Sequence, residues 1–442
     1  MNAKVALHTL GCKLNFSETS TVGKQFLSNG FDIVDYKEKA DVYVLNTCTV
    51  TENADKECRQ YVRKALKENP EAFIIVMGCY AQLRPDEIAS IKGVDLILGS
   101  NEKFKIFSLV DSFNKKNLAC IYTSSHDELN EFGPASSSDA DDRTRAFLKI
   151  QDGCDYKCSF CTIPLARGKS RSMDSNGAVE SFNHLLEQGY KEIILTGVNV
   201  GDYGKFIDTD LYSLLLKFNK IEGDFRIRIS SIEPNLLTDD ILNLTANNNK
   251  FCNHFHIPLQ SGSEKILRLM QRRYKLEDYR NLIYKVQSKI PDAGIGVDVI
   301  TGFPGESKED FLDTYNFIKE LPVSYLHAFT YSERPNTKAI NMNGKLDTHE
   351  KRERTNMLRI LSEKKKFEFH QSMFDKTNEV LFETENHDGF MNGFTSNYIK
   401  VRSTYNEKLV NSFNNVKIKK SYGTYCEAEI ITTDKSVDLL AS

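Results

Sequence analysis

The sequence predicts an α/β protein built from an N-terminal doubly wound parallel sheet domain, a central partial (β/α) barrel and a small C-terminal all-β barrel. Short β-branched runs alternate with amphipathic helical stretches from residue 1 to about 123, and the same alternation resumes from 146 to about 331. From about residue 373 the pattern changes to short strands separated by Gly and Asn turns. A chain of 442 residues is long enough for several such domains.

The domain boundaries follow from composition. We place the first domain at residues 1–123, the barrel domain at 146–370 and the last domain at 373–442. Residues 124–145 are polar and rich in Ser and Asp, which is typical of a solvated linker. Buried parallel strands are expected at residues 5–10, 41–46 and 73–77 of the first domain, and at 146–150, 192–196, 225–229, 255–257 and 295–300 of the second.

The bulk composition excludes several classes of protein. A net charge of −3, 40% hydrophobic residues and 27% charged residues describe an ordinary globular chain rather than a disordered or fibrous one. No run of about 18 apolar residues and no secretory signal pattern is present, so we expect a cytoplasmic protein without a membrane segment. Ten cysteines in a reducing compartment indicate metal ligation or redox chemistry rather than disulfides.

The strongest motif is a CxxxCxxC run formed by Cys154, Cys158 and Cys161, just after the first expected barrel strand. Three thiolates within eight residues can ligate three irons of a cubane cluster and leave the fourth iron open to a small chelating cofactor. The alternative is a structural zinc site, which would need a fourth ligand nearby. No further Cys or His occurs between Asp152 and His184.

Cys12, Cys48 and Cys79 form a second group, although their spacing alone is uninformative. Each directly follows the end of an expected parallel strand, and the carboxyl ends of such strands converge on one crevice. The three thiols are therefore expected to meet, the alternative being three unrelated buried cysteines. The other four cysteines lack this placement and are expected to be inert apolar residues, namely Cys58, Cys120, Cys252 and Cys426.

The CxxxCxxC run, with an aromatic residue before its last cysteine, resembles the motif of the radical S-adenosylmethionine superfamily. The resemblance implies a 4Fe-4S cluster on Cys154, Cys158 and Cys161 that binds and cleaves S-adenosyl-L-methionine. The rest of the chain resembles the methylthiotransferase family, in which Cys12, Cys48 and Cys79 would hold a second 4Fe-4S cluster that carries the sulfur to be transferred. The matching motifs are TLGCKLN (9–15), NTCTV (46–50), GCYAQ (78–82), ARG (166–168), LTGV (195–198), SSIEP (230–234), HIPLQSGS (256–263) and GFPGE (302–306).

Four residues at the expected strand ends are candidates for binding S-adenosylmethionine. Gly197 and Asn199 suit its methionyl end, and Ser231 and Glu233 suit its ribose hydroxyls. The alternative is turn geometry for the glycine and a loop role for the glutamate. Arg171 either pairs with a carboxylate or is solvated, and the sequence identifies no catalytic residue beyond the clusters.

The last domain interleaves basic and aromatic residues, which suits phosphate contact and base stacking. It resembles the TRAM domain, a small RNA-binding barrel, and this implies tRNA as a partner. The basic residues are Lys400, Arg402, Lys417, Lys419 and Lys420, and the aromatic ones are Phe394, Tyr398, Tyr405 and Tyr422.

Members of the family act on N6-threonylcarbamoyladenosine in tRNA, on N6-isopentenyladenosine in tRNA, or on an aspartate of a ribosomal protein. Residues 11–15, 45–51, 167–172 and 327–332 most resemble the first group, which adds the methylthio group at carbon 2 of the adenosine 3′ of the anticodon. Asn336 and Lys338 depart from the group's usual Gly and Pro. The resemblance also implies an electron donor such as flavodoxin or ferredoxin and a sulfur source. A non-catalytic iron–sulfur RNA-binding or electron-transfer protein is the alternative from another class.

Overall fold

The N-terminal domain is a six-stranded, all-parallel sheet in the order β2-β1-β3-β4-β5-β6. The computed structural model describes residues 2–49, 52–136 and 144–431. The strands are β1 (Lys4–Thr9), β2 (Asp32–Val34), β3 (Val42–Thr47), β4 (Phe73–Gly78), β5 (Leu96–Leu98) and β6 (Cys120–Tyr122). The helices are α1 (Lys13–Ser28), α2 (Glu52–Glu68), α3 (Cys79–Leu83), α4 (Pro85–Ala89) and α5 (Ile106–Leu109).

Both faces of this sheet are buried, which explains its near-continuous apolar strands. On one face Val44 packs in a core with Phe26 of α1, and on the other Leu45 packs in a core with Val62 of α2. The predicted doubly wound domain is therefore present, and all its strands point their carboxyl ends at one edge.

The central domain is an open, all-parallel partial barrel in the order β7-β10-β11-β12-β13-β14. Isolated parallel bridges, Ile227 to Phe251 and Ser231 to His256, join its two three-stranded halves. Its strands are β7 (Arg145–Lys149), β10 (Glu192–Thr196), β11 (Arg226–Ile229), β12 (His254–His256), β13 (Gly294–Thr301) and β14 (Tyr325–Thr330). Its helices are α6 (Ile163–Arg167), α7 (Ser175–Glu187), α8 (Leu211–Asn219), α9 (Asp239–Ala246), α10 (Glu264–Leu269), α11 (Leu276–Lys289), α12 (Lys308–Glu320) and α13 (Thr348–Ser372), and a short hairpin pairs β8 (Gln151–Asp152) with β9 (Arg171–Ser172).

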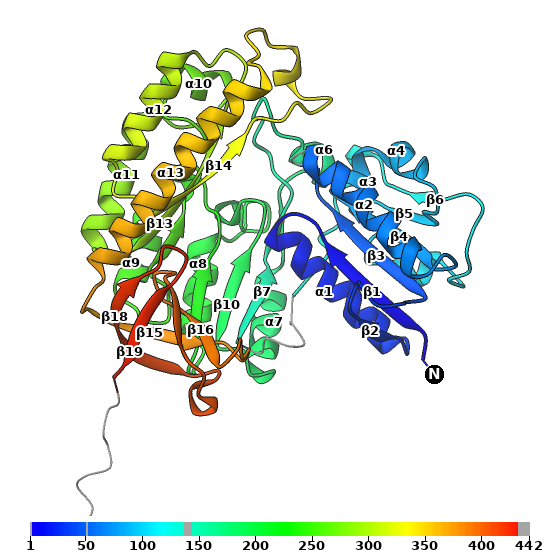
Figure 1. The fold of residues 1–442 in the computed structure, drawn as a ribbon, viewed down its shortest axis with the longest axis horizontal. Helices are drawn as coiled ribbons and strands as arrows, with labels where there is room; N and C mark the ends of the chain where they lie inside the picture. Colours follow the sequence, from blue (N-terminus) through cyan, green and yellow to red (C-terminus); the bar gives the residue numbers. More distant parts are fainter. Residues whose placement is uncertain (1, 50–51, 137–143, 432–442) are drawn as a thin grey trace, which may run out of the picture.

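The C-terminal domain is a closed five-stranded barrel. Its strands are β15 (Thr377–Phe382), β16 (Phe390–Thr395), β17 (Lys400–Thr404), β18 (Phe413–Ser421) and β19 (Cys426–Ile430). Figure 1 shows this barrel and the N-terminal domain packed against different sides of the central domain. None of the helices in the described ranges is long and apolar enough to span a bilayer.

The C-terminal barrel docks through the turn between β16 and β17. Arg226 donates to the carbonyl oxygen of Phe394 at 2.8 Å, and Arg228 donates to that of Ser396 at 3.1 Å. Both arginines also pair with the buried carboxylate of Glu192, at 2.6 and 2.7 Å. Because both arginines lie on β11, and Arg226 is its first residue, they hold the turn at the amino-terminal ends of the central strands.

The segment after β6 differs from the expected solvated linker. Leu129 has no exposed surface, and Ser136 bridges to Leu148 of β7. Asn101 of the N-terminal domain donates to the carbonyl oxygen of Glu128 at 2.8 Å. Residues 124–136 therefore contact both domains at a few positions, while most of their side chains are exposed, and residues 137–143 of the expected linker lie outside the described residues.

Candidate cofactor and substrate cavity

The CxxxCxxC residues lie on a loop between β8 and α6, whose path is fixed by backbone contacts. Gly153 has φ +68°, and a Cβ there would lie 1.9 Å from the carbonyl oxygen of Lys169, so only glycine fits. Cys154 N donates to the carbonyl oxygen of Gly168 at 3.1 Å, and Cys161 N donates to that of Cys158 at 3.1 Å. The loop thus returns on itself and gathers three sulfurs.

Donors aimed at these sulfurs fit thiolate ligands of a cluster. The backbone N–H groups of Tyr156 and Ile163 lie 3.4 Å from the Sγ atoms of Cys154 and Cys161. Arg272 reaches the Sγ of Cys158 at 3.1 Å. Hydrogen bonds to sulfur are among the interactions by which proteins tune iron–sulfur clusters. Burial raises the pKa of the Cys154 and Cys161 thiols to about 12, so these thiols ionise only on binding a metal.

Cys12, Cys48 and Cys79 follow the carboxyl ends of β1, β3 and β4, as the sequence predicts. Gly11, at φ +102°, packs on Cys48 so closely that a Cβ there would lie 2.9 Å from its Sγ. Burial raises the pKa of the Cys79 thiol, and the nearby Arg167 guanidinium offsets part of this rise. The three residues lie at the carboxyl ends of three neighbouring strands, at the edge of the sheet that faces the central domain.

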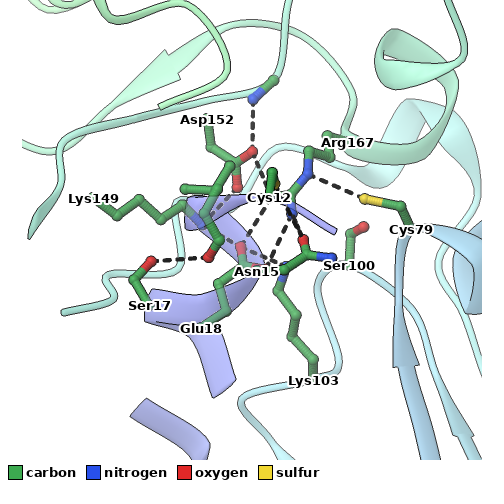
Figure 2. A network of polar contacts seen from close by, with 12 residues as sticks. Cys12, Asn15, Ser17, Glu18, Cys79, Ser100, Lys103, Lys149, Asp152 and Arg167 are labelled. Carbon is green, nitrogen blue, oxygen red and sulfur yellow. Dashed lines mark hydrogen bonds and ion pairs between the residues drawn. The ribbon is translucent and has the colours of Figure 1, made fainter. Parts of the chain in front are cut away.

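A buried charge network joins this edge of the sheet to the central domain (Figure 2). Arg167 of α6 donates from Nε to the Sγ of Cys79 at 3.2 Å and from its other nitrogens to Asn15 and Glu18 of α1, at 2.7 and 2.9 Å. It also pairs with Asp152 at 3.0 Å. Arg167 is 1% exposed, so these contacts replace all of its hydration.

Two lysines complete the network around the same carboxylates. Lys103 and Lys149 lie 2.7 and 3.0 Å from Glu18, and Lys149 also lies 2.6 Å from Asp152. The cationic neighbours hold the pKa of both carboxyls well below the usual range despite burial. Burial lowers the pKa of Lys103 to about 8.

Two adjoining cavities occupy the interior of the partial barrel. The larger, about 580 Å³, is bordered by Cys12, and the smaller, about 220 Å³, by Cys161. They adjoin each other, since Ile163, Asp298 and Phe329 line both. The volumes suit small-molecule ligands. One cysteine of each group therefore lines one of two adjoining cavities.

Several polar atoms that line these cavities are buried without a hydrogen-bond partner in the described part of the chain. They are Thr196 Oγ1, Ser230 Oγ, His254 Nδ1 and Tyr331 OH. Because an unsatisfied buried polar group is costly, their grouping indicates a site for a polar ligand.

The predicted cofactor-binding residues divide into two pairs. Gly197 and Ser231 line the larger cavity, and Ser231 Oγ lies 2.6 Å from His256 Nδ1. Asn199 and Glu233 do not line either cavity. The side chain of Asn199 accepts a hydrogen bond from the backbone N–H of Glu233 at 3.3 Å. Glu233 forms an ion pair with Arg272, the arginine that contacts Cys158.

Arg171 pairs with Asp152 at 3.3 Å rather than facing the cavity. No sequence motif predicted a cluster inside the cavity, in which one nitrogen or oxygen atom from each of His256, Asp298 and His327 lies within 4.8 Å of the others. His256 and Asp298 stand on strands expected to line the barrel, whereas His327 stands on β14, which is not among the expected strands. Of the remaining cysteines, Cys58, Cys252 and Cys426 are buried in cores and Cys120 is partly buried.

Two family models match the chain. Residues 4–99 match "Uncharacterized protein family UPF0004", and residues 148–318 match the radical SAM superfamily. The two matches fall on the two domains that carry the cysteine groups.

Curated relatives match over nearly the whole chain. A threonylcarbamoyladenosine tRNA methylthiotransferase from Bacillus subtilis is 39% identical, over 97% of this chain and 96% of the relative. A protein of the same name from Aquifex aeolicus is 39% identical, over 92% and 99%. A tRNA-2-methylthio-N(6)-dimethylallyladenosine synthase from Fusobacterium nucleatum is 34% identical, over 94% and 97%.

Among solved structures, the radical S-adenosylmethionine methyltransferase TsrM from Kitasatospora setae is similar, with a TM-score of 0.56 over 77% of each chain. Its sequence identity is 13%, so this likeness concerns the fold alone.

Proposed function

The chain belongs to the tRNA methylthiotransferase family of radical S-adenosylmethionine enzymes, and we propose that it converts N6-threonylcarbamoyladenosine, at the adenosine 3′ of the anticodon, to its 2-methylthio derivative. Enzymes of this family use S-adenosylmethionine and 4Fe-4S clusters. The relatives named for threonylcarbamoyladenosine reach 39% identity, against 34% for one named for dimethylallyladenosine. The first name therefore fits this chain better.

One observation carries the proposal: a cysteine of each group borders one of two adjoining cavities. Cys12 lines the larger cavity and Cys161 the smaller one. A reaction that activates a carbon at one centre and joins it to sulfur from another needs both centres within reach of one substrate. An iron–sulfur carrier without catalysis would have no use for an interior space between its centres.

The cofactors supply a 5′-deoxyadenosyl radical and sulfur, which together functionalise an adenine C2–H that acid, base and nucleophilic chemistry leave untouched. We assign Cys154, Cys158 and Cys161 to the cluster that binds S-adenosylmethionine, and Cys12, Cys48 and Cys79 to the cluster that supplies sulfur. Gly197 and Ser231 would contact the cofactor from the cavity wall.

Asn199 and Glu233 would support this cofactor site indirectly, through the residues that line it. Asn199 accepts from the backbone N–H of Glu233, and Glu233 orients the arginine that donates to Cys158. The role of this pair in our proposal is therefore to hold the loop and the wall in place.

We assign residues 373–442 to a TRAM-type RNA-binding domain, residues 1–123 to the sulfur-donating domain and 146–370 to the radical domain. On the C-terminal barrel, the guanidinium of Arg402 lies 4.4 Å from the ring centroid of Phe390 and 5.4 Å from that of Tyr425. Such cation–aromatic surfaces bind phosphates and stack bases. A cytoplasmic location, a flavodoxin or ferredoxin as electron donor and a separate sulfur source accompany this proposal.

Mass spectrometry of tRNA nucleosides from cells with and without this gene tests the substrate. We expect 2-methylthio-N6-threonylcarbamoyladenosine to disappear in the deletion strain and to return when the gene is restored. A gene with all six cluster cysteines changed to Ala is the matched control and should restore nothing. Loss of 2-methylthio-N6-isopentenyladenosine instead, with the threonylcarbamoyl product unchanged, would show that the substrate is the other modified base.

A further inference from the structure

We propose that the end of the larger cavity nearest the C-terminal barrel, which we call its lower end, binds the threonylcarbamoyl group of the substrate. Lys13, His254 and Tyr398 form this end, and the carboxylate of the substituent binds to Lys13. This inference rests on the proposed function and extends it from the reaction to the recognition of the N6 substituent.

The register of the parallel strands gives the depth of each residue in the barrel. Phe329 pairs with Ile300 near the carboxyl end of β13, whereas His254 pairs with Gly294 at its beginning. Six residues of strand separate these levels, which is roughly 20 Å at the usual rise per residue. The upper level borders the smaller cavity that Cys161 lines, and the lower level faces the C-terminal barrel.

The geometry of adenine gives the direction in which the N6 group points. Carbon 2 and carbon 6 lie on opposite sides of nitrogen 1, so a substituent on N6 points away from the carbon that is modified. With carbon 2 held towards the cluster sites, the N6 group extends down the cavity to the level of His254.

His254 offers an unused hydrogen-bonding atom at this level. It is 4% exposed, its Nε2 lies 2.8 Å from the hydroxyl of Tyr325, and its Nδ1 has no partner among the described residues. Burial, with Arg228 and Lys13 nearby, lowers the pKa of His254 well below its ordinary value. The imidazole is therefore neutral at pH 7 and suits the carbamoyl or hydroxyl groups of the tail rather than its charge.

Lys13 supplies the charge that the lower end needs. Arg228 pairs with Glu192, which it shares with Arg226, and Arg167 pairs with Glu18 and Asp152, whereas the described residues give Lys13 no ion pair. The Lys13 ammonium lies 5.7 Å from the ring centroid of Tyr398 and borders the larger cavity. Tyr398 also packs on His254, with ring centroids 4.8 Å apart, so a residue of the C-terminal barrel completes this end of the site.

The polar lower end favours a threonylcarbamoyl tail over an apolar one. A dimethylallyl group would leave His254 Nδ1 buried without a partner, and it would offer the exposed Lys13 ammonium no counter-ion in place of water. A site that hydrogen-bonds a polar group of its substrate strongly rejects an analogue that lacks this group. An apolar pocket rejects an analogue that carries an additional polar group less strongly.

The test uses anticodon stem–loop RNAs that carry either N6-threonylcarbamoyladenosine or its methyl ester, which removes only the negative charge. The dissociation constant of each RNA is measured with the reconstituted full-length enzyme and S-adenosylmethionine. We expect Lys13→Met to weaken binding of the acid about tenfold, as for a lost charge-assisted hydrogen bond, and to leave binding of the ester within about twofold of wild type.

Lys37→Met, at an exposed lysine of the same domain outside the cavity, is the matched control and should change neither constant. His254→Phe should weaken both RNAs alike, because its contact is to a neutral group. Full iron content shows that the cluster beside Lys13 is intact, and 5′-deoxyadenosine formation shows that the cluster that cleaves S-adenosylmethionine is intact.

Equal effects of Lys13→Met on the acid and the ester, or no effect on either, would overturn the site. A wild-type enzyme that methylthiolates an N6-isopentenyladenosine stem–loop but not the threonylcarbamoyl one would instead overturn the proposed function. The two failures are therefore separable.

Discussion

At the scale of single residues, the contact between Arg167 and Cys79 links the two halves of the chemistry. Arg167 lies six positions after Cys161 in the radical domain, yet its Nε donates at 3.2 Å to a sulfur of the N-terminal domain. An N–H donor on a ligand sulfur stabilises the more reduced state of a cluster. In the cluster assignment that we propose, the radical domain thereby sets a property of the sulfur-donating site.

The reduction potential of that cluster tests this contact. In a protein with Cys154, Cys158 and Cys161 changed to Ala, about half of the iron should remain, all of it on the N-terminal site. In this background Arg167→Lys keeps the charge but removes the Nε donor, so we expect a more negative midpoint potential by EPR-monitored titration. Lys149→Arg, which contacts the same carboxylates but no sulfur, is the control, and equal potentials in both variants would refute the contact.

The sequence predicted the residues of the site to different degrees. The spacing of Cys154, Cys158 and Cys161 within one loop is local information, and the strand-end placement of Cys12 needed only a correct prediction of β1. The pairing of Glu18 with Arg167 spans 149 positions, so no local pattern announces it. It depends on how two domains pack.

At the scale of secondary structure, the β16–β17 turn reaches from the C-terminal barrel into the cavity wall. Tyr398 in this turn has φ +73° and lies over the guanidinium of Arg228 at 4.7 Å. The sequence pattern places Phe394 and Tyr398 among the aromatic residues expected to bind RNA, but both contact arginines of the central domain. An alternating pattern shows which side chains of a strand share one face. It does not show which part of the protein that face contacts.

Gly294 at the start of β13 controls how closely this turn docks. A Cβ at Gly294 would lie 2.1 Å from the carbonyl oxygen of Asn397, so Gly294→Ala must displace the turn. We expect a loss of about 1–3 kcal/mol of stability, as for other overpacked sites, and weaker RNA binding as Tyr398 moves. Thermal unfolding and RNA titration measure the two effects.

Gly23→Ala is the matched change for this prediction. Gly23 lies within α1, and a Cβ there would lie 3.3 Å from a flexible side-chain atom of Ile33 in β2. The stability of the protein should therefore be kept. Unchanged stability and RNA affinity in Gly294→Ala would show that the turn is not held by this contact.

At the scale of the whole molecule, the site exists only where the three domains meet. The N-terminal domain brings Lys13 and three cysteines, the central domain the cavity, and the C-terminal barrel Tyr398. The sequence predicted the three architectures, because each has its own periodicity of apolar residues. It did not predict that residues 124–136 contact two of them, since a polar composition hides a buried Leu129.

Docking of the first two domains should be sensitive to acid, because Glu18 and Asp152 carry lowered pKa values inside the interface. A carboxyl whose folded pKa is depressed stabilises the fold fully above its unfolded pKa, near 4. That contribution falls as pH drops below about 5 and is lost as pH passes through the folded pKa.

Glu18→Gln removes this carboxylate and leaves three buried cations short of a partner, so we expect a loss of about 3–5 kcal/mol at pH 7. The difference in unfolding free energy between wild type and Glu18→Gln should shrink as pH falls from 7 to 4, because only the wild type has this proton to gain. Glu131→Gln, which breaks an exposed ion pair with Lys105, should cost under about 1 kcal/mol at every pH. Denaturant unfolding at each pH gives the three curves, and a gap between wild type and Glu18→Gln that stays constant with pH would mean that Glu18 is not ionised in the docked interface.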